Sequence, residues 1–436
     1  SMTPDLEALR PIADELSAVV DAFGRAGFEL YVVGGLVRDV VGDRSVDLVD
    51  IDLATDAEPA QVRSLLSGRV DSLWRQGEQF GTIGVAVGTR KIEITTYRAE
   101  VYRPDSRKPA VRFSKELGTD LGRRDFTINA MAATLPDLRL VDPFGGMDDL
   151  RAGLLRTPLD PAISFDDDPL RMLRGARFVA TLDLVPVDGV VSAMAQRVDR
   201  LEIVSAERIG DELLKLMGVE RPGGGLGVLD QAGLLEVVIP EYEGVDAHGR
   251  AVDRTMVDAV RPLDPLWRLG AIYGFLDPAA AGRAGDRLRI PRVDRRRLQA
   301  ISDAIVMGTQ LEAVDLPRLR RLAALIGTER DHVAGVLLAR ADAIDPTATD
   351  GQPARLRTAA EVLDEGWAQL ADEDLSDLAP GLSGEQVMEV LGLEPGPAVG
   401  RALDWLEGLR FREGTVPEAQ LRDRLRTWWG RGGGGQ

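Results

Sequence analysis

The feature that most constrains this fold is a change in hydrophobic pattern near residue 160. Strand-like runs such as "ELYVVGG", "VDIDLAT" and "GTIGVAVGTRKIEITTYRAE" all lie between residues 29 and 100. From about residue 164 onward, almost every segment carries apolar residues at helical spacing, with few β-branched runs. A further amphipathic helix is predicted over residues 5–27. The pattern therefore predicts an α+β protein with a sheet in its N-terminal part and a long helical remainder.

Composition narrows the chemistry that the chain can perform. The 436 residues include no cysteine, which excludes disulfides, zinc knuckles and thiol catalysis. The two histidines, His248 and His332, are far apart, so a metal would be held by oxygen ligands, as Mg²⁺ is. No apolar run is long enough to span a membrane and the N-terminus does not read as a signal peptide, so we expect a cytoplasmic location.

The charge pattern points to local rather than general affinity for nucleic acid. The formal net charge of −18 argues against a non-specific nucleic-acid binder. Two segments are nevertheless basic: residues 101–124 carry seven Lys/Arg against three Asp/Glu, and residues 286–297 carry six Arg against two Asp. Such clusters are usually solvated helix faces, so they indicate RNA binding only if chemistry elsewhere in the chain requires RNA.

Two aspartates in one strand-like run form the strongest candidate metal site. Asp50 and Asp52 are two positions apart, which places both carboxylates on the same face of a sheet. Two such carboxylates repel each other unless a cation lies between them, and the spacing suits the Mg²⁺ ions used in phosphoryl transfer. Glu93, in another strand-like run, could complete the set and help to deprotonate an attacking hydroxyl. A solvated turn is the alternative, and Asp47 is a competing ligand.

The glycines before these aspartates predict a phosphate contact. Gly34 and Gly35 end a strand-like run, where bare backbone N–H groups could approach phosphate oxygens closely. Arg38 supplies a cation on the following turn. The segment lacks the third glycine of a dinucleotide-binding fingerprint and the Gly-Lys-Ser/Thr of a P-loop, so neither motif applies.

Several motifs in the same order resemble those of the class II tRNA nucleotidyltransferases. This family contains the CCA-adding enzymes and the bacterial poly(A) polymerases, within the polymerase-β-like superfamily. The motifs are "VVGGLVRD" and "DIDLAT", then "LGRRDFTINAMA" at 121–132, "DDPLRMLRGARF" at 167–178, "SAERIGDELLKLM" at 205–217 and "LGLEPGPAVGRALDWL" at 391–406. The resemblance is dense over residues 30–218 and thinner beyond them.

The resemblance implies four parts. A polymerase-β-like nucleotidyltransferase head with a small mixed or antiparallel sheet would span residues 1–156. A helical neck carrying a nucleotide-selecting motif would span 157–260, a helical body 261–370, and a tRNA-binding helical tail 371–436.

The resemblance also implies the roles of individual residues. Asp50 and Asp52 would bind Mg²⁺, with Glu93 as the third catalytic carboxylate. Asp168 and Arg171 would present hydrogen-bonding groups to the Watson–Crick edge of CTP or ATP. Both bases offer an amino donor beside a ring-nitrogen acceptor, so no nucleic-acid template would be needed. The other nucleotide-binding residues would be Gly34, Gly35, Arg38, Arg124, Asp125, Asn129, Arg174 and Arg177. Arg174 and Arg177 could instead be ion-pair partners on a packed helix.

The resemblance favours a template-independent CCA-adding enzyme that extends the 3′ end of tRNA. The segment "RPDSRKPAVRF" retains the length expected of an enzyme that also adds the final A. A bacterial poly(A) polymerase or an A-only enzyme is the alternative, and an inactive RNA-binding homologue is the alternative of another class. The partners would be CTP, ATP and the acceptor–TΨC half of tRNA, gripped by residues 286–297 and the C-terminal segment. A monomer and a homodimer remain equally open.

Overall fold

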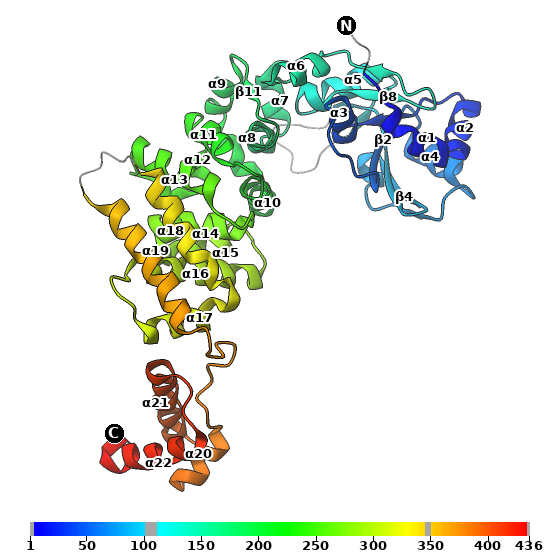
Figure 1. The fold of residues 1–436 in the computed structure, drawn as a ribbon. Coiled ribbons are helices and arrows are strands. Elements are labelled where there is room, and N and C mark those ends of the chain that lie inside the picture. The colour runs from blue at the N-terminus through cyan, green and yellow to red at the C-terminus, as the bar shows by residue number, and fades with distance from the viewer. Residues whose placement is uncertain (1–3, 101–110, 345–349, 434–436) are drawn as a thin grey trace. The chain divides into compact units, whose positions relative to one another are not determined.

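The computed structural model describes residues 4–100, 111–344 and 350–433 (Figure 1). Most of "RPDSRKPAVRF" and the first part of the basic segment 101–124 lie outside the described residues. The chain forms two compact units. The first runs to Leu216 and includes Gly224–Val238, and the second comprises Met217–Gly223 and the chain from Ile239 onward. The predicted four-part division stays a prediction.

A seven-stranded sheet organises the first unit and confirms the predicted α+β class (Figure 1). The order across the sheet is β3-β4-β5-β2-β1-β8-β9. The pair β2–β5 is parallel, and the other neighbouring pairs in this sheet are antiparallel, so the sheet is mixed. The strands are β1 (Tyr31–Val33), β2 (Asp50–Thr55), β3 (Ser72–Trp74), β4 (Thr82–Val87), β5 (Arg90–Thr96), β8 (Ala132–Thr134) and β9 (Leu140–Val141).

Alternation along the central strands gives the sheet one apolar face. Ile51 and Leu53 of β2 are buried, as are Ile92 and Ile94 of β5. They share a core with apolar residues of the N-terminal helices and of α4 (Pro59–Leu66). The predicted helix over residues 5–27 is divided into a 3₁₀ turn (Glu7–Leu9), α1 (Arg10–Glu15) and α2 (Ser17–Ala26). The polar residues of β2 and β5 are therefore left on the opposite face of the sheet.

Short elements carry the chain from this sheet into the helical part of the first unit. The connecting helices are α3 (Gly35–Val41), α4 (Pro59–Leu66), α5 (Leu117–Gly122), α6 (Gly146–Ala152), α7 (Pro161–Asp167), α8 (Leu170–Leu182), α9 (Val190–Ala195), α10 (Ala206–Met217), α11 (Gly223–Gln231) and α12 (Leu235–Val238). Two small ribbons accompany them: β6 (Arg98–Glu100) with β7 (Arg112–Phe113), and β10 (Leu154–Leu155) with β11 (Val185–Pro186). The strand β11 interrupts the otherwise helical pattern that the sequence predicts after residue 164.

The second unit is helical throughout its described residues. Its helices are α13 (Ala247–Ala259), α14 (Pro265–Leu276), α15 (Ala281–Arg287), α16 (Arg292–Thr309), α17 (Leu316–Ile326), α18 (His332–Ala343), α19 (Gln352–Gln369), α20 (Gly384–Leu391), α21 (Pro397–Glu413) and α22 (Glu418–Trp428). The last three helices have an apolar core of their own. None of the helices in the described part of the chain is both long and apolar enough to cross a membrane.

Candidate active site

The predicted carboxylates lie together on the polar face of the sheet. Strands β2 and β5 pair in parallel with Asp52 opposite Glu93, and paired residues point to the same face. Burial raises the pKa of Glu93, and the charges of Asp52 and Asp50 raise it further. Burial also raises the pKa of Asp52, with Asp50 adding to the rise and Arg124 opposing it. The carboxylates are therefore close enough to repel one another, and a cation would relieve that repulsion.

The donor set of this face fits a hard divalent cation. Asp50, Asp52 and Glu93 offer only carboxylate oxygens, the ligands that Mg²⁺ prefers. Within the described ranges, no three Asp, Glu, His or Cys side chains are already gathered in a metal-binding cluster. Asp47, the competing candidate, accepts a hydrogen bond from the backbone N of Val49 at 3.0 Å. The metal-binding roles of Asp50 and Asp52 stay predictions.

The glycine turn lies directly beside Asp52. Gly34 has φ +82, a backbone conformation that glycine adopts without strain. A Cβ atom at Gly34 would lie 3.6 Å from both the Asp52 carboxylate and the Arg124 guanidinium. A Cβ at Gly35 would lie 3.3 Å from the guanidinium of Arg38. Because glycine has no side chain, the backbone at these two positions stays accessible between the Asp52 carboxylate and the guanidinium groups of Arg38 and Arg124.

One cavity of about 460 Å³ collects every predicted nucleotide-binding residue. It reaches the carboxylate face through Asp52. Three further residues that sequence analysis did not single out also line it: Leu170, Phe178 and Arg208. Its residues come from the β1–α3 turn and α3, from strand β2, from the segment after α5, from α8 and the residues just before it, and from α10. Five stretches of sequence thus converge on one hollow beside the sheet.

A buried aspartate holds the cations on one side of this cavity. Asp125 is 7% exposed and accepts hydrogen bonds from Arg174 at 2.6 Å and Asn129 at 3.0 Å. Burial alone would raise the pKa of Asp125, but Arg174 and Asn129 hold it below its usual value. The Asn129 side-chain oxygen in turn accepts a 2.7 Å hydrogen bond from Arg38. Two arginines are thereby linked through one buried carboxylate and one amide.

The aromatic ring of Phe178 lies among three of the cavity's guanidinium groups. The guanidinium carbons of Arg38 and Arg174 are each 5.5 Å from the ring centre, and that of Arg177 is 4.6 Å away. Arg177 also donates to the buried carboxylate of Glu212 at 2.8 Å. Arg174 and Arg177 are therefore ion-pair partners, as the alternative interpretation held, and they also line the cavity. Their contact with a nucleotide stays a prediction.

The pair predicted to choose the base is held where α7 meets α8. One carboxylate oxygen of Asp168 accepts from the backbone N of Leu170 at 3.2 Å, and the other from Arg208 at 3.0 Å. Arg171 donates to the hydroxyl of Ser164 at 3.0 Å and to the backbone oxygen of Arg123 at 2.5 Å. Burial lowers the pKa of Arg171. Both side chains are thus fixed by the protein before any base arrives.

A second cavity, of about 440 Å³, adjoins the first. The two share Asp52, Arg124, Asp168 and Arg171. The second contains Glu93, the predicted third carboxylate, which is absent from the first, together with Thr82, Thr95, Arg98, Asp120 and Arg123. None of these five is predicted as a site residue, because their positions depend on how β4, β5 and α5 pack together.

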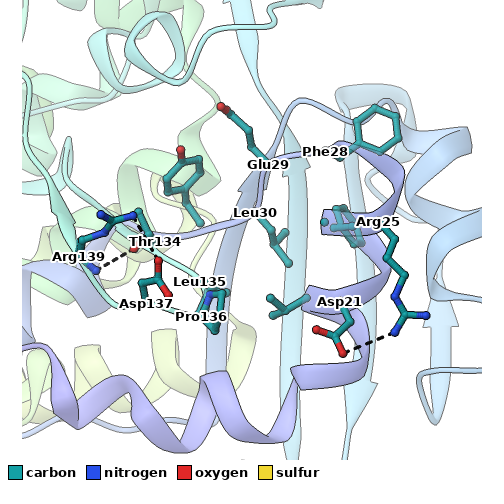
Figure 2. A pocket seen from close by; sticks show the side chains of 14 residues that line it. Asp21, Arg25, Phe28, Glu29, Leu30, Thr134, Leu135, Pro136, Asp137 and Arg139 are labelled. Atoms are coloured by element: carbon teal, nitrogen blue, oxygen red, sulfur yellow. Dashed lines mark hydrogen bonds and ion pairs between the residues drawn. The ribbon is translucent and has the colours of Figure 1, made fainter.

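A cavity of about 540 Å³ at the other end of β1 contains none of the predicted site residues (Figure 2). It lies between the end of α2, the start of β1 and the loop after β8. The pairs drawn there are solvent-exposed: Asp21 with Arg25 at 3.7 Å, and Asp137 with Arg139 at 3.3 Å. Such pairs contribute little to stability and need no ligand. The predicted nucleotide-binding residues, with Asp52 and Glu93, therefore line the two smaller cavities and not this one.

Comparison with known proteins agrees with the fold. Residues 30–156 match a model described as the Poly A polymerase head domain, and residues 188–244 match the probable RNA and SrmB-binding site of polymerase A. Residues 30–156 thus form a head domain of the Poly A polymerase type. The chain as a whole is similar to the class II tRNA nucleotidyltransferases and bacterial poly(A) polymerases.

Individual relatives are CCA-adding enzymes. The one from Bacillus licheniformis is 39% identical over 50% of this chain and 53% of its own length, so the match spans about half of that relative. The one from Limosilactobacillus reuteri is 28% identical over 92% of this chain and 93% of its own. The crystal structure of the Bacillus stearothermophilus CCA-adding enzyme in complex with CTP has a TM-score of 0.71 and 26% identity, covering 97% of this chain and 99% of that one.

Proposed function

We propose that the protein is a template-independent CCA-adding enzyme, which adds C, C and A from CTP and ATP to the 3′ end of tRNA in the cytoplasm. The observation that carries this proposal is the single cavity beside Asp52 that holds every predicted nucleotide-binding residue. The likeness to CCA-adding enzymes along nearly the whole chain supports the same activity.

The reaction is an in-line displacement at the α-phosphate of the nucleotide. The 3′-hydroxyl oxygen of the RNA forms a bond to that phosphorus, the bond to pyrophosphate breaks, and the hydroxyl proton is released. Glu93 would accept the proton, because it lies opposite Asp52 on the same face of the sheet, beside the proposed metal site. Mg²⁺ bound by Asp50 and Asp52 would neutralise phosphate charge as it develops. Gly35 and Arg38 would hold the triphosphate.

Selection of the base rests on Asp168 and Arg171. The carboxylate of Asp168 accepts from an exocyclic amino group, and the guanidinium of Arg171 donates to the neighbouring ring nitrogen. Cytosine and adenine both present that pair of groups, whereas uracil and guanine do not. Because both side chains are already fixed by Arg208 and Ser164, little reorganisation is needed when a base binds.

The tRNA partner fits the arginine-rich segment of the second unit. Three of its six arginines are engaged in ion pairs: Arg287 with Glu241, Arg295 with Asp286, and Arg297 with Glu329. The other three, Arg289, Arg292 and Arg296, are exposed and form no ion pair with the described residues. We propose that these three contact phosphates of the acceptor–TΨC half, which would position the RNA without reading its sequence.

The deciding experiment offers labelled CTP and ATP with Mg²⁺ to tRNA ending in the discriminator base, in -C or in -CC. Completion to CCA followed by a stop is the expected result. A long A tail would identify a poly(A) polymerase, and no incorporation with retained tRNA binding would identify an inactive homologue.

One variant links this activity to the carboxylate face. Asp50→Ala should lower incorporation by about 10³-fold or more, as losing a preorganised electrostatic group does, with tRNA affinity unchanged. Asp47→Ala is the matched control and should retain full activity, because Asp47 is occupied with the backbone of Val49. Equal loss in both variants would contradict the assignment of Asp50.

A further inference from the structure

The second cavity contains an arginine whose guanidinium forms no ion pair with a carboxylate among the described residues. Arg98 begins β6 and lines the cavity with Glu93 and Asp52. Its guanidinium makes one hydrogen bond, from Nη2 to the hydroxyl of Thr82 at 3.1 Å, and its Nε is buried without a partner. Burial lowers the pKa of Arg98, as expected for a dehydrated cation.

The obvious counter-ion is already occupied. One oxygen of Asp120 accepts from the backbone N of Arg98 at 3.1 Å, and the other accepts from Arg124 at 3.1 Å. Arg123, the other new arginine of the cavity, is paired with Asp167 at 3.3 Å. Arg98 therefore differs from Arg123 and Arg124: its half-buried guanidinium has the Thr82 hydroxyl as its hydrogen-bond partner and forms no ion pair among the described residues, which indicates that an anionic ligand supplies the rest.

The arrangement of the two cavities identifies that anion. In-line transfer places the attacking oxygen and the departing pyrophosphate on opposite sides of the α-phosphorus. The first cavity contains the glycine turn and Arg38, where the triphosphate would lie, and the second contains Glu93, the proposed base for the attacking hydroxyl. The RNA must therefore enter through the second cavity, and its last phosphodiester is the anion nearest to its 3′-hydroxyl.

From this geometry we infer that Arg98 binds the 3′-terminal phosphodiester of the RNA and so positions the attacking hydroxyl against Glu93. The inference rests on the proposed nucleotide addition and assigns its RNA-end site. The backbone before Arg98 is well anchored for this purpose: the Tyr97 side chain is fully buried, and its backbone N donates to Thr55 at 2.8 Å. Thr82, hydrogen-bonded to Thr95 at 3.0 Å, steadies the guanidinium.

The test pairs a protein change with a matching RNA change. Arg98→Met removes the charge, and an RNA whose last linkage is a methylphosphonate removes the charge from the phosphate. Each change alone should lower kcat/KM for the RNA about tenfold, the size expected for one charge-assisted hydrogen bond. Together they should cost hardly more than either alone, because they remove the same interaction. KM for CTP at saturating RNA should stay unchanged, and Arg98→Lys should restore part of the activity.

Three results would overturn the inference. The first is that the losses from the protein change and the RNA change add up in the combined experiment. The second is that Arg98→Met raises KM for CTP and leaves KM for RNA unchanged. The third is that Arg98→Met weakens only the inhibition by pyrophosphate, which would assign Arg98 to the leaving group. Arg139→Met, at an exposed arginine of the same unit, is the control and should change none of these quantities.

The test also separates this inference from the proposed function. If the wild-type protein incorporates no nucleotide, the proposed activity fails, yet the affinities of wild type and Arg98→Met for the two RNAs still decide whether Arg98 contacts the terminal phosphate. If Arg98→Met does not fold, the comparison of the two RNAs on the wild type and on Arg98→Lys decides it.

Discussion

The nucleotide cavity and the segment 286–297 are both rich in arginine, but they differ in whether carboxylates pair with those arginines. In the cavity, Arg174 and Arg177 are tied to the carboxylates of Asp125 and Glu212, which are 7% and 3% exposed. In the segment, Arg292 and Arg296 extend into solvent with no ion pair among the described residues. The cavity thus offers cations held by buried carboxylates, whereas these two arginines of the segment are exposed and unpaired among the described residues.

The difference corresponds to two kinds of ligand contact. Selection of a base requires donors and acceptors whose positions are set in advance, because a misplaced guanidinium could satisfy the wrong base. A grip on an RNA backbone requires only positive charge near phosphates, and long unpaired side chains can follow a variable surface. Buried pairs in the cavity therefore serve specificity, and exposed arginines in the segment serve affinity.

The largest effect is expected from breaking the pair of Asp125 and Arg174. Asp125→Ala leaves Arg174 only its longer, 3.7 Å pair with Glu212 and should lower the free energy of unfolding by about 3 kcal/mol. Nucleotide binding should weaken as well, because Asn129 and Arg38 lose their anchor. Chemical denaturation measures the first effect, and KM for CTP the second. Asp137→Ala, which removes an exposed ion pair, should cost about 0.5 kcal/mol or less.

The same pair predicts a pH dependence of stability. The pKa of Asp125 in the folded protein lies below its usual value, so its contribution is fully present above the unfolded-state pKa. That contribution is lost as pH falls through the lowered folded-state value, below about pH 4. Asp125→Asn should flatten this part of the stability profile; an unchanged slope would show that other carboxylates control acid unfolding.

The second effect concerns the choice of base. Asp168→Ala or Arg171→Ala should reduce discrimination of CTP and ATP against UTP and GTP by about 10- to 100-fold, the value of a good bidentate base contact. Competition between labelled nucleotides measures this ratio directly. Arg208→Ala is the matched variant: it frees Asp168 without removing it, so selectivity should fall less than in Asp168→Ala. Unchanged preference in all three would refute selection by this pair.

The spacing of single motifs was enough to predict some of this site but not its charge pairing. The separation of Asp50 and Asp52 by two residues predicts one shared face, since alternation is a local property of strands. The register that brings Glu93 opposite Asp52 depends on parallel pairing of two strands that are not consecutive in the chain.

The partners of the cavity arginines are equally distant in sequence. Arg174 meets Asp125 across 49 positions, and Arg177 meets Glu212 across 35. Local pattern shows that a helix carries cations, but it does not show which carboxylate will neutralise them. The sequence does not predict a role for Arg98, because only the folded structure shows that this arginine lies in the cavity without an anionic partner.

A smaller effect is expected from the exposed arginines. Replacing Arg289, Arg292 and Arg296 with glutamine should weaken tRNA binding about tenfold and reduce the slope of log affinity against log salt by about 2. Base selection and stability should not change. The control replaces Arg25, Arg69 and Arg139, which are exposed on the first unit, and should leave the salt dependence intact. If the triple glutamine variant incorporates CTP and UTP in a different ratio from the wild type, the segment also affects base selection, and the assignment of affinity to the segment and specificity to the cavity is wrong.

The smallest effect is expected from a variant that tests whether an aromatic ring, in addition to the carboxylates, holds the cavity's arginines in position. Phe178→Leu keeps an apolar side chain but removes the ring near Arg38, Arg174 and Arg177, each contact being worth about 0.5–1 kcal/mol. KM for CTP should rise a few-fold while KM for tRNA stays constant. Phe165→Leu, in a fully buried phenylalanine of α7, should lower stability similarly without changing either KM. If both variants raise KM for CTP alike, loosened packing explains the result. If only Phe178→Leu does, the aromatic ring itself positions the cations, and the cavity owes its fixed geometry to an aromatic contact as well as to buried carboxylates.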